Sequence, residues 1–341
     1  MSGQSLFPTT LSLSELVDGQ EADFFAQMTL KEELTTRDGK PYVRVGFRDA
    51  LREVSFPIWN DSPWIKPCQD WSPGEFYKLR ATYRETSYGP QLDLSKVRAV
   101  GKKDQAEGFD PRDFQPSTRF DPAKMFDQLR RLAESGIEEK ALKALVVGIL
   151  DDNRERLLSL PAATRNHHAF LGGWLEHVLC VTQTCVYLAD KYAEHYPQMT
   201  PPLDKGLVVA GGVLHDIGKL RELRELPAGA EYTPEGNLVG HILQGRDIVR
   251  EAAAGQKIAP ETLLRLEHII ISHQRLPEWG SPKPPMTPEA LLVHYADDMD
   301  AKYQMMVAIL GDHTGESPMT TAKNPLRQKI YRGSGAAGPK T

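Results

Sequence analysis

Two patterns of hydrophobic and polar positions divide this chain. Residues 1–105 contain short runs in which apolar and polar residues alternate and aromatic or β-branched residues are frequent, as is typical of strands. The runs predict four strands, near residues 21–30, 41–47, 54–59 and 76–83. Asp38-Gly39 is a common hairpin turn between the first two, and Pro57 indicates an edge or a bulge in the third. Five or so short strands in this length are enough for a small barrel.

The period changes to that of helices after a stretch rich in Gly, Asp and Pro. Asp121 followed by Pro122 is a favourable N-cap and first residue of a helix. Hydrophobic residues then recur with helical spacing, and glycines and prolines separate the segments. Seven helices are predicted, near residues 122–135, 137–152, 172–196, 203–223, 240–254, 260–273 and 288–310. The expected fold class is therefore multidomain β plus α, with a five-stranded barrel followed by an all-α domain.

These patterns suggest four regions. We expect a barrel domain at 1–105, a linker at 106–122, a helical domain at 123–320 and a tail at 321–341. The tail has five basic residues, no acidic residue and a Gly- and Ala-rich end, so we expect it to be disordered. Its charge could add salt-dependent attraction to RNA, although a solvated tail is the simpler interpretation.

Composition excludes several classes of protein. A length of 341 residues with 40% hydrophobic content supports two cores, and the net charge of −5 lacks the basic surplus of many nucleic-acid binders. The three cysteines form no disulfide pattern, which fits a reducing compartment. No basic-then-apolar leader and no apolar run of membrane-spanning length is present. We expect a cytoplasmic protein that does not associate with membranes.

The strongest chemical signal is the run His215-Asp216-Ile217-Gly218-Lys219. It follows an apolar segment that should be buried, and burying an imidazole beside a carboxylate is costly unless a cation compensates. A His-Asp pair can also simply cap a helix. Most of the ten histidines, however, lie between His167 and His294, in apolar, helix-like surroundings. Imidazoles with carboxylates and no cysteine partner argue against a structural zinc site and for a catalytic metal site with open positions.

The order and spacing of these residues resemble a known family. His177, His215-Asp216 and Asp297 match the H…HD…D pattern of the HD-domain metal phosphohydrolases. The resemblance extends to the YhaM-type 3′–5′ exoribonucleases, in which an OB-fold precedes the HD domain. It rests on the segments 167–177, 272–273, 280–282 and 297–302, and on 38–49 in the first domain.

The resemblance implies a set of metal ligands. His177, His215, Asp216 and Asp297 would hold one divalent ion, and Asp216 would bridge to a second ion held by His241 and His273. Manganese is the ion we expect first, with Co²⁺, Fe²⁺ and Mg²⁺ as alternatives, in one or two copies per chain. Gln274 stands where many HD enzymes have a second adjacent histidine, which leaves the second ion open.

Other polar residues are expected around these ligands. Asp216 and Lys219 are candidate catalytic residues, because Lys219 lies one turn after Asp216 and could neutralise a phosphate oxygen, unless it only extends to solvent. His168 is a third candidate through contact with phosphate, while His167 could equally belong to the start of a helix. Residues expected to orient ligands are Glu176, His268, His294 and Asp300, with ligation also open for His268.

An OB-fold binds single strands through stacking aromatics and basic residues. The available side chains are Tyr42, Phe47, Trp59, Tyr77, Tyr83 and Tyr88, with Arg44, Arg48, Lys78, Arg80 and Arg84. Most of the aromatics are expected in the core. We favour Arg84 and Tyr88, which lie in a turn-like segment.

The favoured function is a metal-dependent 3′–5′ exoribonuclease of single-stranded RNA, with single-stranded DNA left open. The 3′–5′ polarity and a homo-oligomeric state come from the resemblance alone. One alternative is a phosphohydrolase of nucleotides or cyclic dinucleotides, for which a strand-binding barrel is unnecessary. Another is a non-catalytic nucleic-acid-binding adaptor, which the intact His215-Asp216 pair disfavours.

Overall fold

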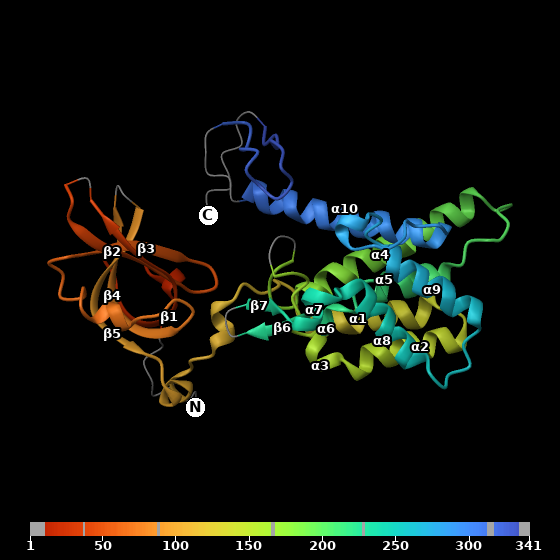
Figure 1. Ribbon diagram of the computed structural model, residues 1–341, viewed down its shortest axis with the longest axis horizontal. Helices are drawn as coiled ribbons and strands as arrows, with labels where there is room; N and C mark the ends of the chain where they lie inside the picture. Colours follow the sequence, from red (N-terminus) through yellow and green to blue (C-terminus); the bar gives the residue numbers. More distant parts are fainter. Residues whose placement is uncertain are drawn as a thin grey trace, which may run out of the picture. The chain divides into compact units, whose positions relative to one another are not determined.

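The computed structural model describes residues 11–36, 38–86, 89–164, 168–226, 229–311 and 317–333. It divides into two compact units, Met1–Pro116 and Ser117–Thr341. Figure 1 shows the large sheet in the first unit, and the α-helices with a short two-stranded hairpin in the second.

The first unit is a five-stranded antiparallel sheet. Its strands are β1 (Glu21–Thr35), β2 (Pro41–Arg48), β3 (Glu53–Trp59), β4 (Phe76–Thr86) and β5 (Gly89–Ala99), in the order β3-β2-β1-β4-β5. The edge strands β3 and β5 also contact each other, so the sheet curls toward a barrel. Alternate side chains point inward and form a core that includes Phe24, Phe47, Leu79 and Tyr77. This strand order is that of an OB barrel, and the predicted fold class is confirmed.

Residues just after the barrel pack onto it. The 3₁₀ helices η3 (Lys102–Glu107) and η4 (Pro111–Phe114) follow β5. The rings of Phe109 and Phe114 each lie 5.3 Å from that of Phe76 in β4. Part of the region expected as a linker at 106–122 therefore packs onto β4 and belongs to the first unit.

A buried aspartate fastens η3 to β5. Asp104 is 1% exposed and accepts hydrogen bonds from both terminal nitrogens of Arg98, at 2.7 and 2.5 Å, and from the Gly101 amide at 2.7 Å. The Arg98 hydrogen bonds lower the pKa of Asp104 to about 2, although burial opposes this.

We expect Asp104→Asn to lower the free energy of unfolding by about 1–2 kcal/mol at pH 7, because Arg98 is half exposed and screened. A carboxyl group with a depressed folded-state pKa stabilises above its unfolded pKa. The difference between wild type and variant should therefore shrink as the pH falls from about 4 to about 2. Urea unfolding followed by tryptophan fluorescence measures it. The control is Asp93→Asn, whose partner Arg84 is exposed, and which should change stability by less than about 0.5 kcal/mol.

The second unit packs its helices around one apolar helix. The main helices are α1 (Pro122–Gly136), α2 (Lys140–Asp152), α4 (Gly173–His195), α5 (Lys205–Leu214), α8 (His241–Ala253), α9 (Pro260–Ser272) and α10 (Pro288–Gly311). Every residue of α5 from Leu207 to Leu214 is buried, as expected for a helix that is hydrophobic all round. Helices α1, α2, α4, α9 and α10 all contact it (Figure 1). The C-terminal end of α5 therefore lies in the interior of the unit.

The predicted helix at 203–223 is wrong in its second half. Helix α5 ends at Leu214, a tight turn spans 215–218, and the short helix α6 covers Lys219–Glu222. In this turn the backbone hydrogen bonds join residues three apart instead of four. Examples are Ile217 N to Leu214 O at 3.1 Å and Lys219 N to Asp216 O at 3.2 Å. Residues three apart share a face in such a segment, so Asp216 and Lys219 point the same way.

Smaller elements complete the unit. They are α3 (Arg154–Leu157), the hairpin β6 (Leu223–Leu226) and β7 (Gly229–Tyr232), α7 (Pro234–Leu238) and η5 (Pro277–Trp279). The region expected as a disordered tail, 321–341, is described up to residue 333, and Tyr331 forms a β-bridge with Met319. Residues 334–341 lie outside the described residues. Among the helices described, none is both long and apolar enough to cross a bilayer.

Candidate metal centre

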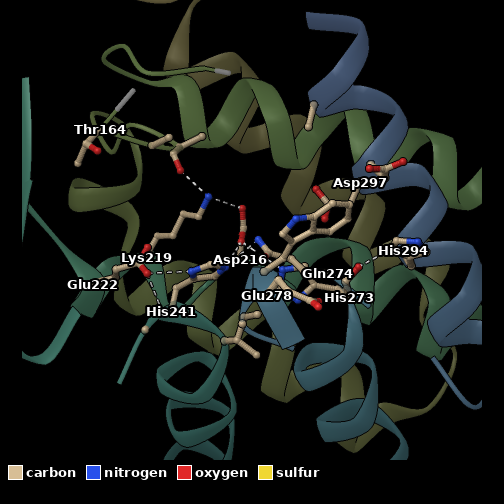
Figure 2. A pocket seen from close by; sticks show the side chains of 18 of the residues that line it. Thr164, Asp216, Lys219, Glu222, His241, His273, Gln274, Glu278, His294 and Asp297 are labelled. Carbon is tan, nitrogen blue, oxygen red and sulfur yellow. Dashed lines mark hydrogen bonds and ion pairs between the residues drawn. The ribbon is translucent and has the colours of Figure 1, made fainter. Parts of the chain in front are cut away.

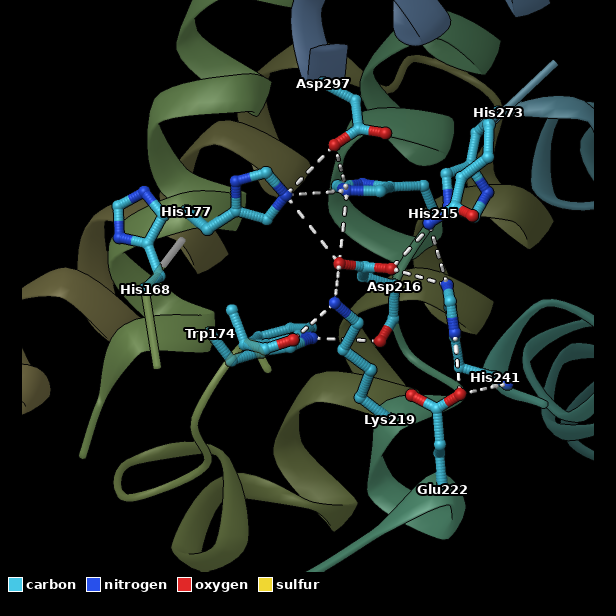
Figure 3. A network of polar contacts seen from close by, with 12 residues as sticks. His168, Trp174, His177, His215, Asp216, Lys219, Glu222, His241, His273 and Asp297 are labelled. Carbon is cyan, nitrogen blue, oxygen red and sulfur yellow. Dashed lines mark hydrogen bonds and ion pairs between the residues drawn. The ribbon is translucent and has the colours of Figure 1, made fainter. Parts of the chain in front are cut away.

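A cavity of about 850 Å³ opens into the second unit. Figure 2 shows acidic, basic and imidazole side chains meeting in it, among them Asp216, Lys219, His241, His273 and Asp297. Its size falls within the range of small-molecule sites. The Asp216 carboxylate is the point at which most of its polar contacts converge (Figure 3).

The turn after α5 holds Asp216 in place. The indole of Trp174, in the first turn of α4, donates a hydrogen bond to the Asp216 carbonyl at 2.9 Å. The Lys219 ammonium lies 2.9 Å from Asp216 Oδ2 and also donates to the carbonyl of Ala162. The Asp216 carboxylate is therefore anchored from its backbone and from one side.

A first cluster lies around Asp216 Oδ2. His177 from α4 and His215 from the turn direct their Nε2 atoms toward this oxygen, each at 3.7 Å. Asp297 from α10 closes the cluster, with Oδ1 at 3.2 Å from His177 Nε2 and 3.8 Å from His215 Nε2. The four side chains are nearly or fully buried and come from three segments far apart in sequence.

A second cluster lies around the other oxygen of the same carboxylate. Asp216 Oδ1 is 3.3 Å from His241 Nε2 and 3.6 Å from His273 Nε2. His241 is the first residue of α8, and His273 follows the end of α9. In both clusters the possible ligand atoms of Asp216 and its two imidazoles lie within 4.8 Å of one another. One carboxylate thus joins two imidazole pairs.

Hydrogen bonds at Nδ1 fix the direction of all four imidazoles. The Nδ1 atom of His215 lies 2.9 Å from Gly212 O, and that of His273 lies 2.7 Å from Ile270 O. The Nδ1 atom of His177 lies 2.7 Å from Asp300 Oδ2, and that of His241 lies 2.9 Å from Glu222 Oε1. Carbonyls and carboxylates can only accept, so each Nδ1 donates and each Nε2 directs a lone pair inward.

This arrangement fits a cation. The Nε2 atoms of His177 and His215 face each other at 3.3 Å, and two lone pairs at that distance require a proton or a metal ion between them. Asp216 Oδ1 and His273 Nε2 are buried and make no hydrogen bond within the described part of the chain. A buried polar atom without a hydrogen bond needs a physical explanation, and a bound ion at this position supplies one. Imidazole and carboxylate donors suit Mn²⁺, Fe²⁺, Co²⁺ or Zn²⁺.

The electrostatics of the first cluster agree with this. Burial opposes a charge on His177, but Asp297 and Asp300 raise its pKa to about 9. Burial lowers the pKa of His215 to about 4, and the nearby carboxylates offset it only in part. Without a metal ion, His177 therefore carries one additional proton at neutral pH, on the Nε2 that faces the Nε2 of the neutral His215.

Positive neighbours also keep the carboxylates ionised. Burial raises the pKa of Asp216, yet Lys219 and the surrounding imidazoles bring that pKa well below its ordinary value. The Asp216 carboxylate in turn raises the pKa of Lys219 above its usual value despite burial. The centre therefore combines ionised carboxylates with inward-facing imidazoles, as a metal site requires.

Comparison with known proteins identifies this part of the chain. The sequence model of the HD-domain family matches residues 174–302. Residues 174–302 form an HD domain. HD domains belong to the metal-dependent phosphohydrolase superfamily. Both clusters, from His177 to Asp297, lie within the matched residues.

Two solved structures align more weakly. The second OB-fold domain of replication protein A from Methanococcus maripaludis is 14% identical, with a TM-score of 0.21, over 27% of this chain and 95% of that one. RecG bound to a three-way DNA junction is 12% identical, with a TM-score of 0.23, over 55% of this chain and 26% of RecG.

Within the HD domain, the structure places the predicted orienting residues differently. Asp300 accepts a hydrogen bond from His177, and His294 Nδ1 donates to the His273 carbonyl at 2.7 Å. Glu176, however, accepts from Thr118 Oγ1 at 2.5 Å, because it points away from the neighbouring His177. His268 accepts from the Met286 amide at 2.8 Å and belongs to neither cluster. In this structure, Glu176 and His268 therefore make these hydrogen bonds away from the two clusters, and their supporting roles stay predictions.

His168 also differs from expectation. Its Nε2 lies 3.1 Å from Asp300 Oδ2, the same oxygen that His177 contacts, and it does not line the cavity formed by the described residues. His168, His177 and Asp300 could hold an ion by distance, but two imidazoles sharing one carboxylate already explain the contact. The expected contact of His168 with phosphate has no support, and His167 lies outside the described residues.

Sequence reasoning missed Glu222 as an orienting residue. It accepts hydrogen bonds from both the Nδ1 and the amide of His241, each at 2.9 Å, and so fixes the start of α8. Gln274 is close to the second cluster, with Nε2 3.4 Å from His241 Nε2. The one signal for Glu222 in the sequence is its position three residues after Lys219, since both residues lie on α6 after the turn.

The expected nucleic-acid candidates of the first unit divide into core residues and surface residues. Phe47, Tyr77 and Tyr83 are core residues. Arg84 pairs with Asp93 at 3.2 Å, and Tyr88 lies outside the described residues. By contrast, Tyr42 and Trp59 are cross-strand partners on β2 and β3, their rings lie 5.2 Å apart, and half of Trp59 is exposed.

Proposed function

We propose that this protein is a metal-dependent 3′–5′ exoribonuclease that hydrolyses single-stranded RNA to 5′-nucleotides, with single-stranded DNA as a further candidate. The observation that carries the proposal is the Asp216 carboxylate, whose two oxygens each face a separate imidazole pair on the wall of an open cavity. Such an arrangement suits a pair of divalent ions acting on one phosphodiester.

The residues that would hold the ions follow from the two clusters. His177, His215, Asp216 and Asp297 would hold one ion, and Asp216, His241 and His273 a second. When bound, these ions would polarise the phosphate and lower the pKa of an attacking water. Gln274 can approach His241 without being a strong ligand, so the second ion would be held more weakly than the first.

The protein's own groups supply positioning. The Nδ1 hydrogen bonds hold the four imidazoles in one tautomer, so ligand geometry costs no rearrangement. Lys219 carries a buried ammonium beside Asp216 on the cavity wall, where it can offset the added negative charge of a phosphoryl transition state.

The first unit supports a polymeric substrate. A barrel with the OB strand order commonly binds single strands through exposed aromatics. Tyr42 and Trp59 form such a pair, with Arg44 on the same face of β2. A nucleotide hydrolase has no need of a strand-binding barrel. The 3′–5′ polarity rests on the resemblance to the YhaM-type enzymes.

A gel time course tests the proposal. With 5′-labelled single-stranded RNA and Mn²⁺, we expect a ladder that shortens from the 3′ end and yields 5′-nucleotides. EDTA should stop the reaction, added Mn²⁺ should restore it, and Asp216→Ala should be inactive because both clusters lose their shared carboxylate. A single-stranded DNA of the same sequence measures the preference for sugar.

Two other outcomes would replace the proposal. Intact RNA with every metal, combined with hydrolysis of nucleotides or cyclic dinucleotides, would indicate a small-molecule phosphohydrolase. RNA binding without hydrolysis of any of these substrates would indicate a non-catalytic adaptor.

A further inference from the structure

An apolar rim surrounds the polar wall of the HD-domain cavity. Tyr232 at the end of β7, Val239 before α8 and Trp279 in η5 all line the cavity, and each is exposed by 45–49%. The side chains of Asp216, His241, His273 and Asp297 from the two clusters line it as well, together with Lys219. With cations held at the two clusters, a ligand that fits such a cavity carries negative charge at one end and a flat apolar group at the other.

Hydrogen bonds connect the loop that carries Trp279 to the end of α9. The Trp279 amide donates to the Leu276 carbonyl at 3.0 Å, and the Ser281 amide donates to the same carbonyl at 3.2 Å. Ser281 is fully buried, and its hydroxyl accepts from the Gln274 amide at 3.1 Å. The backbone of the loop that carries Trp279 is thus tied to Gln274, the residue that follows His273.

A cation lies near the indole as well. The Lys302 ammonium is 6.0 Å from the centre of the Trp279 ring and 2.8 Å from Asp298 Oδ2. Both Lys302 and Asp298 line the cavity. Nearly half of Trp279 remains exposed with Lys302 in place, which leaves apolar ring surface for a ligand.

We propose that Trp279 is the surface on which the base of the terminal nucleotide stacks while its phosphate lies at the metal-binding clusters. This inference rests on the proposed function and specifies its substrate as a nucleotide recognised by its base plane. Stacking on an indole tolerates all four bases, because each has a π-face. Cleavage is therefore expected to show little dependence on the identity of the terminal base.

Two RNA oligonucleotides that differ only at the 3′-terminal residue, one with a base and one abasic, test this role. We expect Trp279→Ala to lower the kcat/KM for removal of the base-bearing residue about tenfold to a hundredfold, and to leave removal of the abasic residue nearly unchanged. Trp279→Phe should retain most of the preference, because it keeps an aromatic face. The matched control is Trp59→Ala, which removes an equally exposed indole from the other unit and should affect both oligonucleotides alike.

A binding measurement separates this inference from the proposed function. By calorimetry in Mg²⁺, 5′-AMP should bind wild type about tenfold or more tightly than ribose 5-phosphate, and Trp279→Ala should abolish the difference. An undiminished preference for 5′-AMP in Trp279→Ala, or equal losses on the two oligonucleotides, would overturn the stacking role. If wild type shortens neither RNA, the exonuclease proposal fails, and the 5′-AMP measurement still decides the role of Trp279.

Discussion

An Asp216→Asn protein should bind divalent ions at neither imidazole pair. Its rate of RNA cleavage should fall by well over roughly 100-fold, the loss that is typical when a group that orients a metal ligand is removed. The substitution keeps the shape of the side chain but removes the charge that both clusters share. Asp216 Oδ2 faces the Nε2 atoms of His177 and His215, and Oδ1 faces those of His241 and His273. Metal content after equilibration with Mn²⁺ and dialysis, together with initial rates, measures the effect.

Asp298→Asn is the matched control for Asp216→Asn. Asp298 lies on the same cavity and also pairs with a lysine, but it belongs to neither imidazole cluster. We expect it to retain both bound metal and most of the activity. Asp216→Asn protein that still bound the full complement of Mn²⁺ would contradict the assignment of Asp216 as the shared ligand.

The same substitution should also destabilise the metal-free protein. Lys219 is 5% exposed and would keep a buried ammonium without its carboxylate partner. Breaking a buried ion pair from one side costs about 3–5 kcal/mol. Adding Lys219→Met to Asp216→Asn should recover part of this stability without restoring metal binding, which separates loss of the site from loss of the fold.

Which residues meet at the candidate metal centre was easier to predict from the sequence than how their side chains are oriented. Residues offering imidazole and carboxylate groups are recognisable by type, and the chain places His177, His215, Asp216, His241 and His273 within two overlapping clusters. Ligation by these residues stays a prediction until a metal is measured. The barrel was predictable for a similar reason, since the alternation in β3 and β4 follows directly from one buried face.

Orientation of the supporting side chains could not be read from spacing. Glu176 and His177 are neighbours on α4 and diverge by about 100°, so only one of them can face the clusters. Whether His168 reaches the cavity or Asp300 depends on a loop that connects distant segments. Glu222 orients His241 only because the helix predicted through residue 223 breaks at the turn after α5 and redirects the chain.

The second large effect is expected at Gly218, in the turn between Asp216 and Lys219. A Cβ atom there would lie 1.8 Å from the His241 carbonyl oxygen and 2.5 Å from the Gly245 amide nitrogen, distances that non-bonded atoms do not reach. Both contacts are with the backbone of α8, so no side chain can move aside. Gly218→Ala should therefore push the start of α8 away from the turn and lower the free energy of unfolding by about 1–3 kcal/mol or more.

Displacement of α8 should affect the two clusters unequally. His241 is the first residue of α8, whereas His177 and Asp297 come from α4 and α10. We therefore expect Gly218→Ala to lose the more weakly held of the two proposed ions and to retain the other. Because misplacement by about 1 Å can cost about 100-fold in rate, cleavage should fall to that extent. Metal titration, initial rates and urea unfolding measure the three consequences.

Gly148→Ala provides the opposite case. Gly148 lies inside α2, and a Cβ atom there would meet nothing within 4 Å. Alanine should stabilise this helix by up to about 1 kcal/mol and leave metal binding unchanged. If Gly218→Ala behaved in the same way, the close approach of α8 to the turn would not hold the second cluster together. A loss of both ions would instead mean that the turn positions Asp216 as well as His241.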